Sequence, residues 1–337
     1  MKFFLTLFLL IICINKSLAA NKSDKVVFLN IYNKDQDIGD AIVIRSNNQY
    51  AMIDTGLKST FQKVKSSIKN IPEFEWVLIT HNHGDHIGGL MDLLKTKKVK
   101  YIYTKDYIGT DMNCKEGYSK KDKKWEQLKD DIKALGKKKE NKGYYNLRII
   151  RKEGDKEKNT KPTLGNYKFK LFNIEQAFSS YTNYCKNNCC NENVNSIVAT
   201  AVNEDGNKFY YFAGDIQEYP SDKLFDKERT NHALTHWVKE AKNYWTSLGF
   251  TINHFHVYKV SHHGLRKNKY GYNNRKSVFK SIKPDICVVT TYTTREKLEK
   301  QINQAKEEVK KEENKFTCKT VYTGNRKEHY AIFNKDL

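Results

Sequence analysis

The feature that most constrains this chain is an apolar strand that runs directly into a dense cluster of histidine and aspartate. Residues 75–80 (EWVLIT) are almost continuously apolar, as is typical of a strand covered on both faces of a sheet. The next residues, 81–86, read HNHGDH, and the apolar spacing after them predicts a helix from about Ile87 to Leu94. A buried strand followed by a helix, with this string between them, indicates an α/β fold that presents polar side chains at the end of a strand.

Ligand-type residues follow the ends of three further predicted strands in the same way, namely Asp54, Asp215 and His263. Side chains that leave the same end of several strands converge on one rim, although these residues are up to two hundred positions apart. Convergent histidine and aspartate are the ligands of a divalent metal site. His81 and His83 project to one side of an extended chain, and Asp85 and His86 begin the helix beside them, so the spacing suits two metals.

The strands fall into two series, each followed by helices, which predicts an αββα sandwich in a single domain over residues 20–337. A lysine-rich surface insertion is expected near 104–146, with helical periodicity at 125–135. The other strands are expected at 25–30, 41–45, 50–53, 147–151, 167–173, 196–203, 208–213, 256–260, 285–290 and 317–322, and the other helices at 61–68 and 295–313.

The first nineteen residues predict a signal peptide. Lys2 is followed by an apolar run at 3–14, and small residues up to Ala19 suit cleavage there. Twelve apolar residues are too few to span the ~30 Å core of a bilayer. The mature protein is therefore expected to be secreted, with no transmembrane segment.

Six cysteines remain after cleavage, and an exported chain can pair them in up to three disulfides: Cys114, Cys185, Cys189, Cys190, Cys287 and Cys318. Cys287 and Cys318 fall on the two strands that flank the C-terminal helix, so we pair them. The cluster at 185–190 enters the strand at 196–203 and is expected to border the cleft.

The formal net charge is +21, from 60 Lys+Arg and 39 Asp+Glu, which favours polyanionic partners. The surplus is locally strong at 115–161, where seventeen basic residues face nine acidic ones. A chain this rich in Lys, Asn, Ile and Tyr also fits the codon bias of an AT-rich genome. A solvated charged face is thus an alternative to a polyanion-binding surface.

The string at 80–89, THNHGDHIGG, resembles the HxHxDH signature of the metallo-β-lactamase superfamily, and IDTG at 53–56 and AGD at 213–215 resemble further motifs of that superfamily in the same order. Gly39-Asp40-Ala41, Asn195-Ser196 and KVSHHG at 259–264 are similar to the hydrolase domain of ComEC-type competence proteins and to phosphorylcholine esterases. The resemblance implies two divalent ions, Zn²⁺ or alternatively Mn²⁺, held by His81, His83, Asp85, His86, Asp215 and His263.

Two departures from that pattern affect the site. Leu265 stands where a serine usually follows the His-His-Gly, and no histidine lies between His86 and His232. Asn195-Ser196 occupies the place of the mid-chain histidine that many members use as a ligand. The first metal, with only His81, His83 and the shared Asp215, is therefore expected to be the more exchangeable.

The expected chemistry is that of paired cations. Two metals about 3.5–4 Å apart, bridged by Asp215 and a water, lower the pKa of that water, and the hydroxide attacks a phosphoester. The residues expected to act in catalysis are His262, Asp85 and Asp54. His262 would position a phosphate oxygen or protonate the leaving group. Asp54 would orient a ligand histidine, and this role is compatible with capping the turn at Thr55-Gly56.

Three function classes remain open. The leading one is a secreted dinuclear phosphodiesterase that acts on a small or polymeric phosphoester, nucleic acid included. The second is a carbonyl hydrolase of the β-lactamase or lactonase type, and the third is a non-catalytic polyanion-binding protein. The remaining histidines are assigned to surface positions rather than to the site: His232, His236, His254, His256 and His329.

Overall fold

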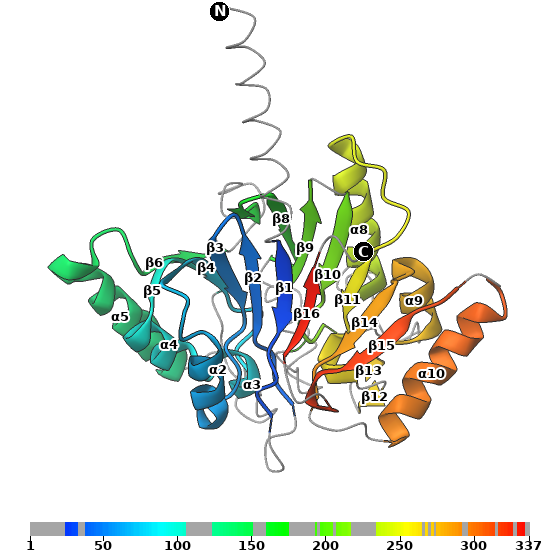
Figure 1. Ribbon diagram of the computed structural model, residues 1–337, viewed down its shortest axis with the longest axis horizontal. Helices are drawn as coiled ribbons and strands as arrows, with labels where there is room; N and C mark the ends of the chain where they lie inside the picture. Colours follow the sequence, from blue (N-terminus) through cyan, green and yellow to red (C-terminus); the bar gives the residue numbers. More distant parts are fainter. Residues whose placement is uncertain are drawn as a thin grey trace, which may run out of the picture.

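The protein is described by a computed structural model (Figure 1). The described residues are 24–32, 38–105, 123–150, 160–174, 193, 196–204, 207–216, 234–264, 267–268, 271–272, 274–291, 296–313, 316–325 and 329–333. The expectations for the signal peptide and for Cys114, Cys185, Cys189, Cys190, Asn195, His232 and Leu265 lie outside the described residues. Among the described helices, none is both long and apolar enough to cross a membrane.

Two seven-stranded mixed sheets form the centre of the molecule (Figure 1). The first runs in the order β16 (Tyr330–Phe333), β1 (Lys25–Phe28), β2 (Ile42–Ser46), β3 (Gln49–Ile53), β4 (Glu73–Leu78), β5 (Lys98–Thr104) and β6 (Asn146–Ile149). The second runs in the order β15 (Lys319–Tyr322), β14 (Ile286–Val289), β11 (Val257–Lys259), β10 (Lys208–Phe212), β9 (Val198–Asn203), β8 (Tyr167–Phe172) and β7 (Thr163–Leu164). A short hairpin joins β12 (Lys267–Asn268) to β13 (Gly271–Tyr272).

Helices cover the outer face of each sheet, so the αββα sandwich expected from the sequence is confirmed (Figure 1). The first sheet carries α2 (Phe61–Ser67), α3 (Gly84–Ile87), α4 (Leu90–Thr96) and α5 (Lys123–Lys137). The second carries α8 (Leu234–Ser247), α9 (Lys276–Ile282) and α10 (Glu296–Lys310). Short 3₁₀ turns are η1 (Lys58–Thr60), η2 (Lys139–Asn141), η5 (Ser261–Gly264) and η6 (Thr323–Asn325).

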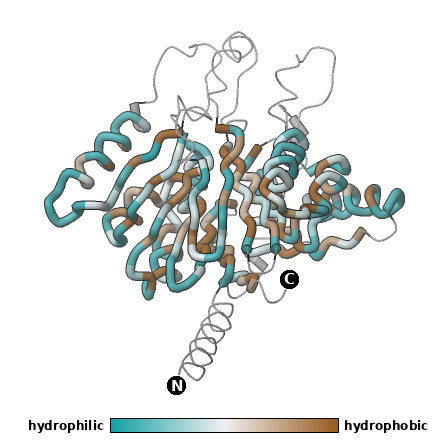
Figure 2. Tube along the Cα trace, turned by 90° about the horizontal axis from the view of Figure 1, so that it is seen from above, coloured by the Kyte–Doolittle hydropathy of each residue, from teal (hydrophilic) through white to brown (hydrophobic). Residues whose placement is uncertain are grey.

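Three apolar layers hold this arrangement together. The central layer lies between the sheets and includes Trp76, Phe169 and Phe212, with the Trp76 and Phe169 rings 4.9 Å apart. The other two lie between each sheet and its helices. Figure 2 shows that the hydrophobic stretches gather toward the middle of the molecule, while its periphery is mostly hydrophilic. Burial on both faces explains why strands such as β4 and β9 read as apolar runs.

The described part of the lysine-rich stretch differs from the expected surface insertion. The helix predicted at 125–135 is present as α5, but Trp125 and Ile132 on it are fully buried in the first helix layer. The strand β6 after it pairs in parallel with β5, which extends the first sheet. The helix is amphipathic: Lys133 and Lys137 are exposed on its outer face, while Trp125 and Ile132 pack into the core and Lys129 is buried beside Trp125.

The pairing of Cys287 with Cys318 is confirmed: a disulfide joins them, with their Cα atoms 6.2 Å apart. It links β14 to the residue before β15, and these two strands lie side by side in parallel. The disulfide therefore connects β14 to the start of the edge strand β15, and α10 lies between the two cysteines in the sequence.

Candidate metal centre

Asp54 stands at the turn that follows β3, where the chain adopts a left-handed conformation with φ of 57°. Its N–H donates to the Leu78 carbonyl at 2.8 Å. Gly89 allows the helical segment that follows the histidine string to approach this turn, because a Cβ there would meet the Thr55 carbonyl oxygen at 2.5 Å. Backbone packing thus brings the Asp54 carboxylate against the histidine string.

The carboxylate of Asp54 is fully buried and accepts three hydrogen bonds. Thr80 donates through its backbone N–H at 2.8 Å and through its hydroxyl at 2.7 Å. The third partner is His86, whose Nδ1 lies 2.7 Å from Oδ2 of Asp54. Asp54 was expected to orient a site histidine, and its contact with His86 is present. This contact at Nδ1 directs Nε2 of His86 away from Asp54.

The second sheet contributes Asp215 and His263 from the ends of β10 and β11. The Asp215 N–H donates to the Ser196 hydroxyl at 3.0 Å, so the serine that stands in the place of a mid-chain histidine positions an aspartate. His263 has φ of 52°, in the left-handed region. Its Nδ1 lies 3.1 Å from the Thr290 hydroxyl and 3.5 Å from Asp40, which directs Nε2 to the same point as that of His86.

Four imidazoles converge on the Asp215 carboxylate. Measured from their Nε2 atoms, the distances to its nearer oxygen are 3.3 Å for His86, 3.4 Å for His263, 3.8 Å for His81 and 3.9 Å for His262. Asp85 approaches from the other side, with Oδ2 3.0 Å from Nε2 of His263. Nδ1 of His83 lies 3.1 Å from Nε2 of His81. The structure therefore brings together all the residues predicted from the sequence to bind metal.

Burial and charge in this cluster shift the pKa values strongly. Burial lowers the pKa of His81 well below its usual range. Burial also opposes the charged form of His86, but the carboxylates of Asp215 and Asp85 outweigh it and raise the pKa of His86. Burial would raise the pKa of Asp215, yet His263, His86 and Lys259 hold it well below its usual range. Carboxylates kept ionised in a dry interior are a strong ligand set for a cation.

The residues present fit divalent metal ions. The buried Nε2 atoms of His86 and His263 have no hydrogen-bond partner, although both point at carboxylate oxygens. Buried polar atoms without partners are rare, and a coordinated cation would satisfy both lone pairs. Asp40, His86, Asp215 and His263 each offer a ligand atom, and these four atoms lie within 4.8 Å of one another. His86, His263, Asp85 and Asp215 could hold one ion, and His81, His83 and Asp215 a second.

His262 lies at the mouth of this cluster. It adopts a left-handed backbone with φ of 50°, and its Nε2 is 3.1 Å from the side-chain amide nitrogen of Asn193. Burial lowers the pKa of His262 to about 4, so the imidazole is neutral near pH 7. A neutral imidazole can hydrogen-bond a substrate oxygen, but it is a poor source of a proton for a leaving group.

Sequence reasoning gave no site role to Asp40, Lys259, Thr290 or Asn193. Asp40 and Lys259 had been noted only as parts of the motifs at 39–41 and 259–264. A usable signal was present in Lys259, a lysine in the apolar strand sequence VYKV, because a charge in a buried strand requires a buried partner.

A second group of ligand-type residues lies before the start of β11, where Nε2 of His254 is 3.0 Å from Asp285 and His256 is adjacent. The group is partly exposed, and Nδ1 of His256 accepts the Phe209 N–H at 3.0 Å. The placement of His254 and His256 away from the site is confirmed.

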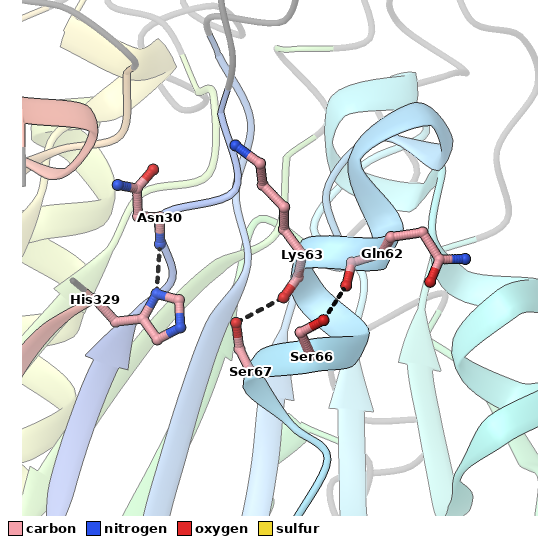
Figure 3. Close-up of a pocket in the computed structure, with 6 residues that line it drawn as sticks. All are labelled: Asn30, Gln62, Lys63, Ser66, Ser67 and His329. Atoms are coloured by element: carbon pink, nitrogen blue, oxygen red, sulfur yellow. Dashed lines mark hydrogen bonds between the residues drawn. The ribbon is translucent and has the colours of Figure 1, made fainter. Parts of the chain in front are cut away.

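The hollow drawn in Figure 3 is a polar pocket of about 550 Å³ lined by Asn30, Gln62, Lys63, Ser66, Ser67 and His329. Its serine hydroxyls donate to the Gln62 and Lys63 carbonyls of their own helix, and the Asn30 N–H donates to His329. These polar groups bond within the pocket wall and form no set of ligands, so this pocket is a weaker candidate for chemistry than the cluster around Asp215.

Comparison with known proteins agrees with this geometry. Residues 35–163 match the model of the metallo-beta-lactamase superfamily. A metal-dependent hydrolase of Thermodesulfovibrio yellowstonii is 33% identical over 76 residues, which are 22% of this chain and 28% of that protein. The match therefore spans less than a third of the curated relative's length.

Solved structures are similar in fold over most of the chain. The metallo-beta-lactamase fold protein YhfI of Bacillus subtilis superposes with a TM-score of 0.51 over 92% of this chain and 99% of that protein, at 11% identity. The short form of human tRNase Z superposes with a TM-score of 0.46 over 91% and 98%, at 12% identity. Residues 35–163 therefore match the metallo-β-lactamase superfamily, the solved structure of YhfI shares the fold, and the described residues include a buried His/Asp group that could hold metal ions.

Proposed function

We propose that this protein is an exported metal-dependent hydrolase that binds two divalent ions, with zinc as the first choice and manganese as the second, and cleaves phosphodiesters. The observation that carries the proposal is the convergence of the Nε2 atoms of His81, His86 and His263 on the Asp215 carboxylate. When bound, a pair of divalent ions supplies an activated water as nucleophile and stabilises the negative charge that develops on the substrate.

The residues around the centre have separable roles. Asp54 holds Nδ1 of His86, and the Thr290 hydroxyl, with Asp40 beside it, lies against Nδ1 of His263, which keeps both imidazoles in the ligand orientation. His262 is neutral and lies at the mouth, where it is placed to contact a non-bridging oxygen of the substrate rather than to supply a proton. Asp85 faces His263 and completes the ligands of one half of the centre.

Phosphodiester chemistry is favoured over carbonyl chemistry by charge. The chain has a formal net charge of +21, and Lys259 adds a fixed positive charge directly beneath Asp215. Both features favour an anionic substrate over a neutral ester, lactone or β-lactam. The similarity to ComEC-type domains in the motifs at 39–41 and 259–264 supports the same choice.

The test is a substrate panel on protein reconstituted with Zn²⁺ or Mn²⁺. We expect turnover of bis-p-nitrophenyl phosphate and little turnover of a chromogenic β-lactam or a lactone. Turnover of the β-lactam or lactone alone would replace the proposal with carbonyl hydrolysis. Fewer than one metal bound per chain, with no turnover, would favour a non-catalytic binding protein. The presence of mature protein in the medium of expressing cells, cleaved after Ala19, would test export.

Polymeric substrates need a separate measurement. If the basic surface holds a single-stranded nucleic acid, log Kd will change with log salt by roughly 0.7 per phosphate contact. The matched control is turnover of the small phosphodiester in the same salt series. Equal salt responses would limit the proposal to small phosphoesters.

A further inference from the structure

Lys259 is a buried lysine in a strand of the second sheet and lies directly behind the candidate metal centre. Its side chain is about 1% exposed. The ammonium group contacts three oxygens: Asp40 Oδ2 at 2.5 Å, the Gly214 carbonyl at 2.9 Å and Asp215 Oδ1 at 3.4 Å. A lysine ammonium has three N–H donors and no acceptor, so this set of acceptors matches the charged form.

The partners of Lys259 connect it to the ligands in two ways. Asp215, at the centre of the cluster, is a direct partner. Asp40 is the second, and its two oxygens also lie 3.7 Å from Nδ1 of His86 and 3.5 Å from Nδ1 of His263. The Asp40–Lys259 pair therefore touches the rear of both histidines and one side of the shared carboxylate.

We propose that Lys259 is a fixed third cation of this centre, which holds Asp40 and Asp215 in place and leaves the metal-loaded site with a surplus of positive charge for an anionic substrate. The proposal rests on the proposed function, since it requires that the cluster bind divalent metal. It makes Lys259 a positioning residue that tunes specificity, not a group that touches the substrate.

The charge balance explains why this cation matters. Asp40, Asp54, Asp85 and Asp215 carry four negative charges in or directly behind the cluster, which equal the four positive charges of two divalent ions. Lys259 adds one positive charge that does not dissociate with the metals. Its presence therefore weakens metal binding by repulsion and strengthens binding of a phosphodiester anion. Because the side chains of Lys259, Asp40 and Asp215 are buried, water screens these charges less than it would at the surface.

Three variants change this charge one unit at a time. Lys259→Met removes the cation, Asp40→Asn removes one carboxylate, and the double variant restores the net charge of the wild type without the ion pair. The cycle separates charge from packing, because the double variant loses every contact that either single variant loses. Lys170→Met is a matched control, since Lys170 is a buried strand lysine of the same sheet that contacts Thr160, Phe172 and Tyr244.

The first readout is Zn²⁺ affinity, measured by competition with a chelator. We expect Lys259→Met to bind about tenfold tighter than the wild type or more. That is the scale on which a charge within about 4–6 Å shifts the proton affinity of a carboxylate. Lys170→Met should resemble the wild type, Asp40→Asn should bind most weakly, and the double variant should bind more tightly than Asp40→Asn. The second readout is KM for bis-p-nitrophenyl phosphate, which should rise several-fold in Lys259→Met and not in Lys170→Met.

Weaker Zn²⁺ binding by Lys259→Met than by the wild type would overturn the proposal and leave the proposed function intact, with Lys259 reduced to a packing role. Absence of metal binding in the wild type itself would overturn both. If Lys259→Met fails to fold, the comparison of Asp40→Asn with the double variant remains. These two differ only at Lys259, and the double variant must bind Zn²⁺ more tightly.

Discussion

Two groups of histidine and aspartate lie near opposite ends of the short strand β11, and they differ in burial and in the hydrogen bonds of their imidazoles. After the strand, His263 and its neighbours bury their side chains around Asp215, with their Nδ1 atoms held from behind. Before the strand, His254, His256 and Asp285 are partly exposed. There Nδ1 of His256 accepts a backbone N–H and Nε2 of His254 bonds Asp285.

The two groups contain the same residue types and differ in what contacts the second nitrogen of each imidazole. An imidazole becomes a ligand when its other nitrogen is held by an acceptor, which leaves the coordinating nitrogen without a proton. His86 has Asp54 in that role, and His263 has the Thr290 hydroxyl at 3.1 Å with Asp40 3.5 Å away. His256 has the reverse arrangement, because a nitrogen that accepts a backbone N–H leaves the proton on the other nitrogen.

The largest expected effect contrasts the two groups directly. Asp215→Ala should abolish metal binding at the buried centre and reduce phosphodiester turnover to background, because all four imidazoles lose the carboxylate they share. Asp285→Ala in the exposed group should leave metal content unchanged. Elemental analysis after reconstitution measures both. Full metal binding by Asp215→Ala would contradict the assignment of the centre.

A smaller loss is expected from Asp54→Asn, which preserves the shape of the side chain but weakens its hold on Nδ1 of His86. Changes behind a metal ligand cost about 10–100-fold in metal affinity or activity. Chelator competition with Zn²⁺ measures the affinity, and a thermal melt controls for folding. An unchanged affinity would mean that Asp54 serves only the turn at Thr55-Gly56.

A substitution of His262 is expected to lower turnover without changing metal binding. His262→Gln is expected to lower kcat for bis-p-nitrophenyl phosphate about tenfold, while the metal content stays at the wild-type value. The pH profile gives a second measurement: because the pKa of His262 is lowered to about 4, its protonation should not shape activity between pH 6 and 8. A tenfold loss of Zn²⁺ affinity in this variant would make His262 a ligand instead.

The smallest expected effect belongs to the exposed group and appears as a pH dependence of stability. Burial lowers the pKa of His256 to about 4, below the ordinary value of 6.5, so the unfolded chain takes up the proton first as the pH falls. The stability contributed by neutral His256 is complete above pH 6.5 and is lost between pH 6.5 and 4. Allowing for partial exposure, we expect about 1–2 kcal/mol.

His256→Gln tests this pH dependence, because its amide oxygen can accept the same Phe209 N–H without titrating. Urea unfolding at pH 7 and pH 4.5 should show a smaller loss of the free energy of unfolding in the variant than in the wild type. Identical losses would assign the acid sensitivity to the buried centre alone.

Local patterns in the sequence predict the layered α/β architecture and the ligand-type residues. Buried strands such as β4 and β9 must be apolar on both faces, and a turn that leaves a strand must carry polar side chains, so both appear as local patterns. His81, His83, Asp85, His86, Asp215 and His263 were found from their order and from their positions after strands. The disulfide between Cys287 and Cys318 followed from two strands that flank one helix.

The residues that stand behind these ligands come from distant segments and could be identified only in the folded protein. Asp40 and Lys259 are 219 positions apart in the chain, and Thr290 lies on a third segment, so no local pattern joins them. The role of α5 was decided in the same way: its lysines suggested a surface insertion, but Trp125 and Ile132 are core. Periodicity reports which face of an element is apolar, whereas contacts between distant segments depend on how the sheets and helices pack. The difference between the two histidine groups arises from such contacts between distant segments.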